Sequence, residues 1–278
     1  MTRARLLVVG TPIGNLDDLS PRATAALAGA DTIACEDTRR TGRLLAAGGI
    51  EAPRLLAVHE HKEAAGADEV VRRLDAGEVV ALVTDAGMPA VSDPGRRVVA
   101  AAARAGYPVE VVPGPSAVSA ALAVAGLPGD RFVFEGFLPR KGAERTRRLA
   151  ALAGDPRTVV LYEAPHRLAR TLADLAEQFG DREVVVAREL TKLHEEVWRG
   201  FLVDAAERAE AEAPRGEHVL VIRGAPPPAA ASDAELDDLL TAHLADGLST
   251  RDAASEAAAR LGVPRRRAYS RAVRLSDD

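Results

Sequence analysis

The chain has 278 residues, of which 47% are hydrophobic and 28% charged, a balance that excludes a disordered or fibrous protein. Its net charge of −5 excludes a general nucleic-acid binder, so a polyanion partner has to meet local basic patches. The single cysteine, Cys35, excludes an internal disulfide, and no CxxC motif or Cys/His cluster predicts a metal site. The first apolar run is too short for a signal peptide or a membrane span, and we expect a cytoplasmic protein.

In the first half of the chain, short apolar runs alternate with segments of helical period. This pattern predicts βαβ units and a mainly parallel sheet. Strands are expected at Arg5–Val9, Asp31–Ala34, Arg54–Ala57, Val79–Val83 and Val109–Val112. Helices are expected at Pro21–Ala28, Arg39–Ala46, Ala67–Ala76 and Gly95–Ala105. Ser20 before Pro21 is an N-cap followed by proline at the first helical position, which marks the start of the first helix.

A helix to about Ala125 and the turn-rich segment GLPGD predict a boundary between an N-terminal α/β domain, 1–126, and a second α/β domain, 127–224. Because KLHEEVWRGFL has the pattern of one arm of an antiparallel pair, the second sheet is expected to be mixed. Its strands are expected at Phe132–Glu135, Thr158–Tyr162, Glu183–Arg188, Glu196–Phe201 and His218–Arg223. Its helices are expected at Ala143–Ala153, Pro165–Gln178 and Val203–Ala211.

The prolines and small residues of GAPPPAAAS predict a semi-rigid linker at 225–232. Three helices are expected in the tail that follows, 233–278, at Asp233–Ala245, Thr250–Leu261 and Pro264–Leu275. The last two are joined by LGVP, and the third opens with three arginines. This is the outline of a helix-turn-helix, although any small three-helix bundle gives a similar pattern.

Rigid loops of small residues follow three of the predicted strands. VGTPIGN at 9–15 is neither a dinucleotide nor a phosphate-loop signature. In DAGMPAVSDPG at 85–95, we favour a ligand role for Asp85, whereas Asp93 is equally compatible with a plain turn. PGPSA at 113–117 places small residues at a helix start, where free backbone N–H groups can meet a ligand. If these last two loops lie at adjacent strand ends, they form a crevice.

Three polar segments of the second half also follow predicted strands: EGFLPRKG, YEAPHR and RELTKLHEE. Their repeated position predicts a site between the two halves, although His166 is also compatible with a local role at a helix start. Arginine and lysine gather in three patches, which are either solvated helix faces or a footprint for RNA. The patches are Arg39, Arg40 and Arg43; Arg140, Lys141, Arg145, Arg147 and Arg148; and Arg265, Arg266, Arg267, Arg271 and Arg274.

Seven motifs, in this order, resemble the tetrapyrrole methylase superfamily, and within it the subgroup that methylates small-subunit ribosomal RNA. The motifs are GTPIGNL, CEDTRRTGRLL, DAGMPAVSDPG, PGPSA, GFLPRKG, YEAPHR and RELTKLHEE. The similarity spans about residues 5 to 223, and the tail resembles the helical extension of that subgroup. Met88 departs from the pattern, because the family often has threonine there, so only a backbone contact is expected to survive at this position.

The resemblance implies a homodimeric two-domain α/β methyltransferase that binds S-adenosylmethionine between its halves. It implies 2′-O-methylation of a cytidine in the decoding region of 16S ribosomal RNA, with the free RNA or the 30S subunit as partner. The implied cofactor contacts are Pro12, Asp85, Gly87, Met88, Ser116, Ala117, Tyr162, Leu190 and Thr191, with Gly216 as a further candidate. RNA contacts are expected at Arg39, Arg40, Arg140, Lys141, Arg145, Arg265, Arg266 and Arg267.

Transfer of a methyl group to a ribose hydroxyl depends on in-line alignment, so rigid loops that hold the donor still contribute through positioning. The hydroxyl is a poor nucleophile and requires a general base or a lysine that stabilises the developing alkoxide. The sequence favours Lys192 and Glu163, with His166, Glu189 and His194 as further candidates.

Two alternatives stay open at this point. The acceptor could be a corrin or porphyrin precursor, although a small macrocycle needs neither basic patches nor a helical tail. The chain could instead be a DNA-binding regulator whose α/β body senses a ligand and whose tail reads a groove, which predicts duplex sequence preference from Arg265–Arg274.

Overall fold

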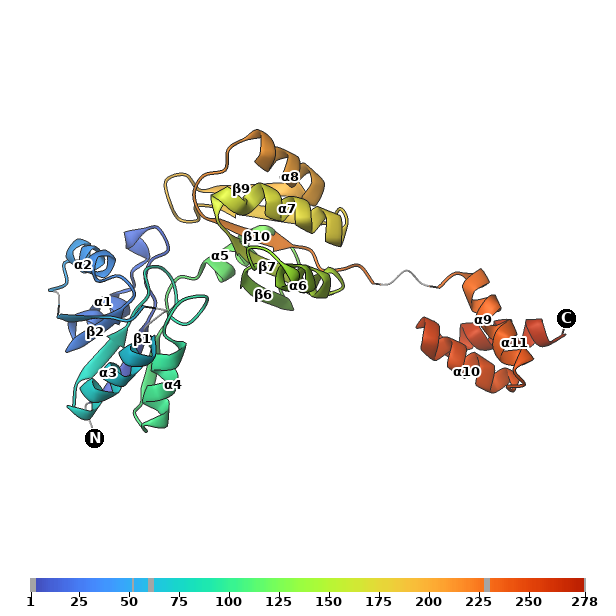
Figure 1. Cartoon of the computed structure of the whole chain (residues 1–278), viewed down its shortest axis with the longest axis horizontal. Helices are drawn as coiled ribbons and strands as arrows, with labels where there is room; N and C mark the ends of the chain where they lie inside the picture. The colour runs from blue at the N-terminus through green and yellow to red at the C-terminus, as the bar shows by residue number, and fades with distance from the viewer. Residues whose placement is uncertain (1–3, 52, 60–62, 228–230, 278) are drawn as a thin grey trace. The chain divides into compact units, whose positions relative to one another are not determined.

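The computed structural model describes residues 4–51, 53–59, 63–227 and 231–277. The chain divides after Ala225 into two compact units, a large α/β unit and a small helical one (Figure 1). The predicted linker, 225–232, includes residues 228–230, which lie outside the described residues.

The first sheet of the large unit is wholly parallel and has the strand order β3-β2-β4-β1-β5. Its strands are β1 (Arg5–Val9), β2 (Thr32–Cys35), β3 (Arg54–Ala57), β4 (Val79–Leu82) and β5 (Val109–Val112). Helices α1 (Pro21–Ala28) and α2 (Thr38–Ala47) pack on one face, and α3 (Glu63–Asp75) and α4 (Arg96–Arg104) on the other (Figure 1). The Ser20 hydroxyl accepts a hydrogen bond from the Ala23 amide, as its N-cap position predicts.

Strands β4 and β5, whose loops were expected to be neighbours, are separated by β1. The chain leaves β1 for α1 on one face of the sheet and leaves β4 for α4 on the other. The carboxyl ends of β1 and β4 therefore form the topological switch point, the place where open α/β sheets bind ligands. The expectation that the loops after β4 and β5 are direct neighbours is therefore corrected. The loop after β1 lies between them and contacts both.

The second sheet has the order β6-β7-β10-β8-β9 and is mixed, as predicted. Only β6 and β7 pair in parallel, and the other pairs are antiparallel. Its strands are β6 (Phe132–Phe137), β7 (Thr158–Glu163), β8 (Glu183–Arg188), β9 (Glu196–Phe201) and β10 (His218–Ile222). One face is covered by α6 (Ala143–Ala153), α7 (Pro165–Phe179) and α8 (Leu202–Ala211).

Helix α5 (Ala117–Ala125) covers the other face of the second sheet. Its buried residues Val118, Ala121 and Ala125 share a core with Val160 of β7 and Val221 of β10. The helix that follows the PGPSA loop is therefore part of the second core, and a boundary placed at 126/127 falls after it. Consequently the PGPSA loop itself is the passage from the first sheet to the second.

The small unit consists of α9 (Asp233–Ala245), α10 (Thr250–Leu261) and α11 (Arg265–Asp277). A capping box between Ser232 and Glu235 starts α9, and Gly262 ends α10 in the left-handed conformation at φ 64°. Leu236 and Leu240 pack on buried alanines of α10 and α11. Across the described residues, no helix of either unit is both long and apolar enough to cross a membrane.

Candidate functional site

Three strand-end loops of the first sheet meet through backbone contacts. Thr11 and Gly87 exchange backbone hydrogen bonds of 2.9 and 3.1 Å, which join the β1 loop to the β4 loop. A methyl group on Gly10 would lie 2.7 Å from the Cα atom of Gly114, so only glycine allows the β1 and β5 loops to touch. The three loops therefore form one rigid edge at the switch point.

The second sheet supplies the opposite wall. A Cβ atom at Gly14 would lie 2.3 Å from the Lys192 side chain, which shows how closely the β1 loop approaches the β8–β9 loop. Likewise, a Cβ at Gly136 of β6 would lie 2.7 Å from the Ser92 hydroxyl. Both contacts bring loops of the two sheets together around a shared space.

A cavity of about 440 Å³ lies between these loops. Apolar side chains form much of its lining, and polar groups enter from the β4, β7, β8 and β10 ends. The lining residues include Ile13, Ala86, Gly87, Met88, Val91, Asp93, Ser116, Ala117, Phe137, Tyr162, Glu163, Glu189, Leu190, Lys192, Glu217 and His218. This mixture of apolar walls and a few convergent polar groups is typical of a small-molecule site.

Most of the cofactor contacts expected from the sequence line this cavity. Six of the nine do so: Gly87, Met88, Ser116, Ala117, Tyr162 and Leu190. Pro12 and Thr191 flank it in the chain, and Gly216 lies at φ 79° against the Glu189 side chain. The Ser116 hydroxyl makes no cap hydrogen bond although it stands at the start of α5. Burial together with the charge of Asp93 raises the pKa of Tyr162 to about 12, although the nearby Val118 amide opposes the shift.

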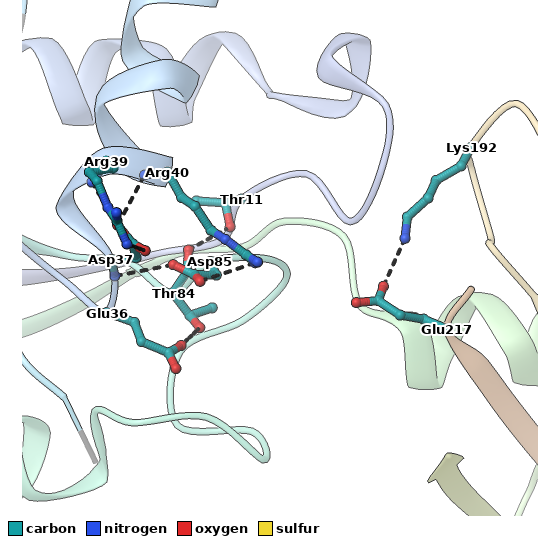
Figure 2. A network of polar contacts seen from close by, with 9 residues as sticks. All are labelled: Thr11, Glu36, Asp37, Arg39, Arg40, Thr84, Asp85, Lys192 and Glu217. Atoms are coloured by element: carbon teal, nitrogen blue, oxygen red, sulfur yellow. Dashed lines mark hydrogen bonds and ion pairs between the residues drawn. The ribbon is translucent and has the colours of Figure 1, made fainter. Parts of the chain in front are cut away.

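Asp85 is another expected contact that does not line the cavity. Its carboxylate accepts a hydrogen bond from the Asp37 amide at 3.2 Å and pairs with Arg40 at 3.2 Å. Figure 2 shows this carboxylate directed at Arg40 and the start of α2. The acidic side chain therefore fastens the β2 loop to the β4 loop rather than facing the cavity.

Asp93 and His218 line the cavity, and the sequence did not single them out as site residues. Burial, reinforced by the charges of Glu36 and Asp85, raises the pKa of Asp93 to about 6, although the nearby Thr84 hydroxyl opposes the shift. Burial and the nearby Arg188 lower the pKa of His218, whose Nδ1 atom is inaccessible and without a hydrogen-bond partner among the described residues. The sequence does contain a signal that could have identified His218, because this residue is polar and stands at the start of a buried strand.

Lys192 enters the cavity wall with two carboxylates beside it. Its Nζ atom lies 2.9 Å from Glu189 and 2.8 Å from Glu217, the second contact being drawn in Figure 2. Burial alone would lower the pKa of Lys192, but the hydrogen bonds with Glu217 and Glu189 outweigh it, and the pKa lies above its usual value. The side chain is therefore a fixed cation and not a base.

Glu163 lines the cavity but belongs to a buried network. One carboxylate oxygen accepts from the Ala164 amide at 2.9 Å and pairs with Arg167 at 3.1 Å, and the other accepts from Thr171 at 2.6 Å. Since both oxygens are engaged and the side chain is buried, this geometry opposes the expected role as base. Of the three further candidates, Glu189 lines the cavity and pairs with Lys192. His166 and His194 are exposed and are not among the cavity-lining residues.

Arg145, expected to contact RNA, is buried at 4% exposure. Its guanidinium donates to Asp174 at 2.8 Å, to the Pro139 carbonyl at 3.0 Å and to Thr171 at 3.1 Å. No face of this guanidinium is available to a phosphate. The expectation is corrected, because Arg145 extends the Glu163 network and holds α6 to α7.

The other basic residues that were expected to contact RNA differ in how exposed their charges are and in whether they are paired. The side chains of Arg39 and Arg40 are 88% and 62% exposed while pairing with Asp37 and Asp85. Arg267 is committed to Asp233 and to the Ala231 carbonyl, at 2.7 and 2.8 Å. Four further cations are exposed and have no ion-pair partner in the described part of the chain: Arg140, Lys141, Arg265 and Arg266.

The fold and the cavity define a class of protein: a two-domain α/β protein with a small-molecule site where the strand-end loops of both sheets meet. The family of Tetrapyrrole (Corrin/Porphyrin) Methylases matches residues 5–206, and the RsmI C-terminal HTH domain matches residues 230–276. The chain belongs to the tetrapyrrole methylase family, with that helix-turn-helix domain at its C-terminal end.

Full-length relatives share one name, Ribosomal RNA small subunit methyltransferase I. The relative from Synechocystis sp. is 45% identical, covering 98% of this chain and 99% of the relative. The relative from Xylella fastidiosa is 48% identical, covering 96% and 98%. Among solved structures, the methyltransferase CobJ is 25% identical with a TM-score of 0.61, covering 80% of this chain and 95% of that one. A uroporphyrin-III C-methyltransferase from Thermus thermophilus, complexed with S-adenyl homocysteine, has a TM-score of 0.57 at 22% identity, covering 78% and 96%, and shows the fold alone.

Proposed function

We propose that the chain methylates small-subunit ribosomal RNA with S-adenosylmethionine as methyl donor, and that the acceptor is the 2′-hydroxyl of a cytidine in the decoding region of 16S RNA. The observation that carries the proposal is the cavity at the switch point, built from the loops expected to hold the donor. The shared name of the full-length relatives supports the RNA acceptor over a corrin or porphyrin precursor. The tail supports it as well, because a macrocycle needs no helix-turn-helix domain.

The cavity suits this donor in size and chemistry. Ile13, Met88 and Leu190 offer apolar surface for an adenine ring, and the free Ser116 hydroxyl and the start of α5 offer polar contacts. When bound, the cofactor supplies an electrophilic methyl group on a sulfonium. The cofactor contacts are proposed to be those predicted from the sequence, with Asp85 acting through its backbone and through the loop that it fastens.

Binding of the donor is tested by filling the cavity. Ala86 is exposed at the surface and lines the cavity, so Ala86→Phe adds bulk there without entering the core. We expect S-adenosylmethionine to lose at least about tenfold in affinity, measured by calorimetry, because the ring occupies the space of the ligand. Ala103→Phe, at an exposed position of α4, is the matched control and is expected to bind normally. Equal affinities in the two variants would place the cofactor elsewhere.

RNA contacts are proposed at Arg39, Arg40, Arg140, Lys141, Arg265 and Arg266. The first turn of α11 begins with Arg265–Arg267 and contains no acidic residue, although the positive end of the helix dipole disfavours cations there. Arg265 and Arg266 are exposed and have no ion-pair partner among the described residues, so their charges are available to phosphates. The loop that carries Arg140 and Lys141 presents two more exposed cations, which have no ion-pair partner among the residues that the structure describes.

Charge reversal tests these contacts. The double variants Arg140→Glu/Lys141→Glu and Arg265→Glu/Arg266→Glu are expected to weaken binding of small-subunit RNA and to reduce the slope of log affinity against log salt by about one per lost contact. Arg96→Glu/Arg104→Glu on α4 changes the net charge equally and is the control. A control that weakens binding as much as the test variants would mean that only net charge matters.

A homodimer is proposed as the working assembly. Apolar side chains are exposed along α5 and the neighbouring sheet edges, including Val111 at 54%, Phe132 at 42% and Val124 at 36%. Phe132 also lines a groove with Val91 and Leu122. A second copy of this chain that covers this surface would bury it, and sedimentation velocity measures whether one does.

A further inference from the structure

A second cavity lies on the face of the second sheet that α7 and α8 cover (Figure 1). Its volume is about 290 Å³, against about 440 Å³ for the cavity at the switch point. We call it the α7–α8 pocket. Side chains of β8, β9 and β10 line it from the sheet, and the segment 212–215 after α8 lines its rim. Among the described residues, the two cavities share one lining residue, His218, so the α7–α8 pocket is a separate space.

The α7–α8 pocket contains flat groups suited to a planar ring. Trp198 of β9, the single tryptophan of the chain, lines it beside Leu172 of α7. A Cβ atom at Gly200 would lie 2.5 Å from the Cη2 atom of Trp198, so the glycine makes room for the indole ring. The guanidinium of Arg208 lies over this ring, 5.8 Å from its centroid. Aromatic and guanidinium surfaces of this kind stack with nucleobases.

The same pocket has an excess of positive charge, because three arginines and two glutamates line it. Arg208 is committed to Glu196 at 2.6 Å and to Glu212 at 3.5 Å. Arg188 reaches Glu196 at 3.4 Å, which is long for a charge-assisted hydrogen bond. Arg215 is exposed and has no ion-pair partner in the described part of the chain. The guanidinium groups of Arg188 and Arg215 are therefore available to an anion.

Two polar atoms in the wall of the α7–α8 pocket have no hydrogen-bond partner among the described residues. They are the Nε atom of Arg188 and the Nδ1 atom of His218, a residue that is only 4% exposed. Burial and the nearby Arg188 lower the pKa of His218, so its ring is neutral at pH 7. Buried polar atoms without a partner are rare in native proteins. A polar occupant of the pocket supplies the missing partner when either side chain turns toward it.

We propose that the α7–α8 pocket binds a nucleoside monophosphate, with the base against Trp198 and the phosphate against Arg188 and Arg215. Guanidinium groups are well suited to phosphate because they present several N–H donors to its oxygens. The Glu212 carboxylate, 71% exposed at the rim, can accept from ribose hydroxyls. Small-molecule sites begin at roughly 300 Å³, so this volume limits the ligand to about one nucleotide. The nucleotide is either one residue of an RNA chain or a free molecule, and the inference does not depend on methyl transfer.

The experiment titrates the full chain with cytidine 5′-monophosphate and follows the fluorescence of Trp198, which reports on this pocket because the chain has no other tryptophan. A saturable change with a Kd below about 1 mM is expected. Inorganic phosphate alone and cytidine alone are expected to bind at least about tenfold more weakly, because each makes only part of the contacts. Saturating S-adenosylmethionine is expected to leave the Kd of the nucleotide within about threefold, since it occupies the other cavity.

Two variants test the named contacts. Arg215→Glu is expected to weaken nucleotide binding at least about tenfold and, because the side chain is exposed, to keep the melting temperature of the wild type. Arg104→Glu, at an exposed position of α4 without an ion-pair partner among the described residues, changes the charge equally and is expected to bind normally. Trp198→Leu removes the fluorescence signal, so calorimetry measures its expected loss of roughly tenfold in affinity.

Competition with small-subunit RNA identifies the source of the nucleotide. RNA that displaces cytidine monophosphate from the wild type, and that binds Arg215→Glu less tightly than Arg104→Glu, supports the site and assigns it to a nucleotide of the RNA. RNA that does not displace it supports the site as one for a free nucleotide.

Three results overturn the inference: a wild type that binds no cytidine monophosphate by fluorescence or calorimetry, equal affinities in Arg215→Glu and Arg104→Glu, and displacement of the nucleotide by S-adenosylmethionine. The last result would place the nucleotide in the cavity at the switch point. Wild-type protein that binds the nucleotide as expected but transfers no methyl group to small-subunit RNA overturns the proposed function alone.

Discussion

Arg145→Met is expected to lower the free energy of unfolding by about 3 kcal/mol, the largest stability effect predicted for this chain. Methionine keeps most of the apolar volume but leaves Asp174 without its closest cation and Thr171 and the Pro139 carbonyl without their donor. Breaking a buried ion pair from one side is more destabilising than losing a surface pair, because the remaining charge stays desolvated. Urea denaturation followed by circular dichroism measures the difference.

Arg147→Met is the matched control, because Arg147 lies two residues further along the same helix and is exposed. Its effect on the free energy of unfolding is expected to stay within about 0.5 kcal/mol. Should Arg145→Met instead retain full stability and lose affinity for RNA, the buried position of the side chain would be refuted.

Arg145 also shows which signal the sequence contained and how it was overlooked. In the helix Ala143–Ala153, Arg145 lies four residues before Leu149 and seven before Leu152, and all three are buried on one helix face. A charged residue in register with an apolar stripe predicts a buried, paired cation. Grouping the basic residues by proximity in the chain concealed that register, because neighbours along a helix point in different directions.

Asp85 and Asp93 mark the limit of what the loop sequence could predict. The strand before them and the helix after them follow from apolar periodicity, and β4 and α4 begin within a residue of the expected positions. Which aspartate faces the cavity depends on the φ angles of Ala90 and Ser92 and on contacts with Arg40 and Glu63, from segments distant in the chain. The residue pattern within the loop contains no information on contacts with such distant segments.

The strand order of the first sheet could not be predicted from the hydrophobic pattern of the sequence either. Alternation of strands and helices predicts a parallel sheet, but the insertion of β1 between β4 and β5 is set by how the crossover helices divide between the two faces. The expectation that the loops share a crevice nevertheless agrees with the structure, since Gly87 of one loop and Ser116 of the other line the same cavity. The glycine contact between the β1 and β5 loops makes this possible.

Lys192→Met is expected to reduce kcat by about 10²–10³-fold, because it removes a charge that is held beside the cavity. The ammonium is positioned by Glu189 and Glu217 and is protonated at neutral pH, because the hydrogen bonds with these carboxylates keep its pKa above its usual value. We propose that this cation stabilises the negative charge that develops on the acceptor oxygen. A preorganised cation does this without reorganising at the moment of reaction.

The measurement separates this role from cofactor binding. If Lys192 acts on the developing alkoxide, Lys192→Met lowers kcat and leaves the KM for S-adenosylmethionine nearly unchanged, and Lys192→Arg recovers part of the rate because the charge is restored. Glu217→Gln is the matched control: Glu217 is 82% exposed, so it removes one partner of the ammonium with a rate loss of less than about tenfold. A raised KM with an unchanged kcat in Lys192→Met would instead assign the ammonium to the carboxylate of the donor.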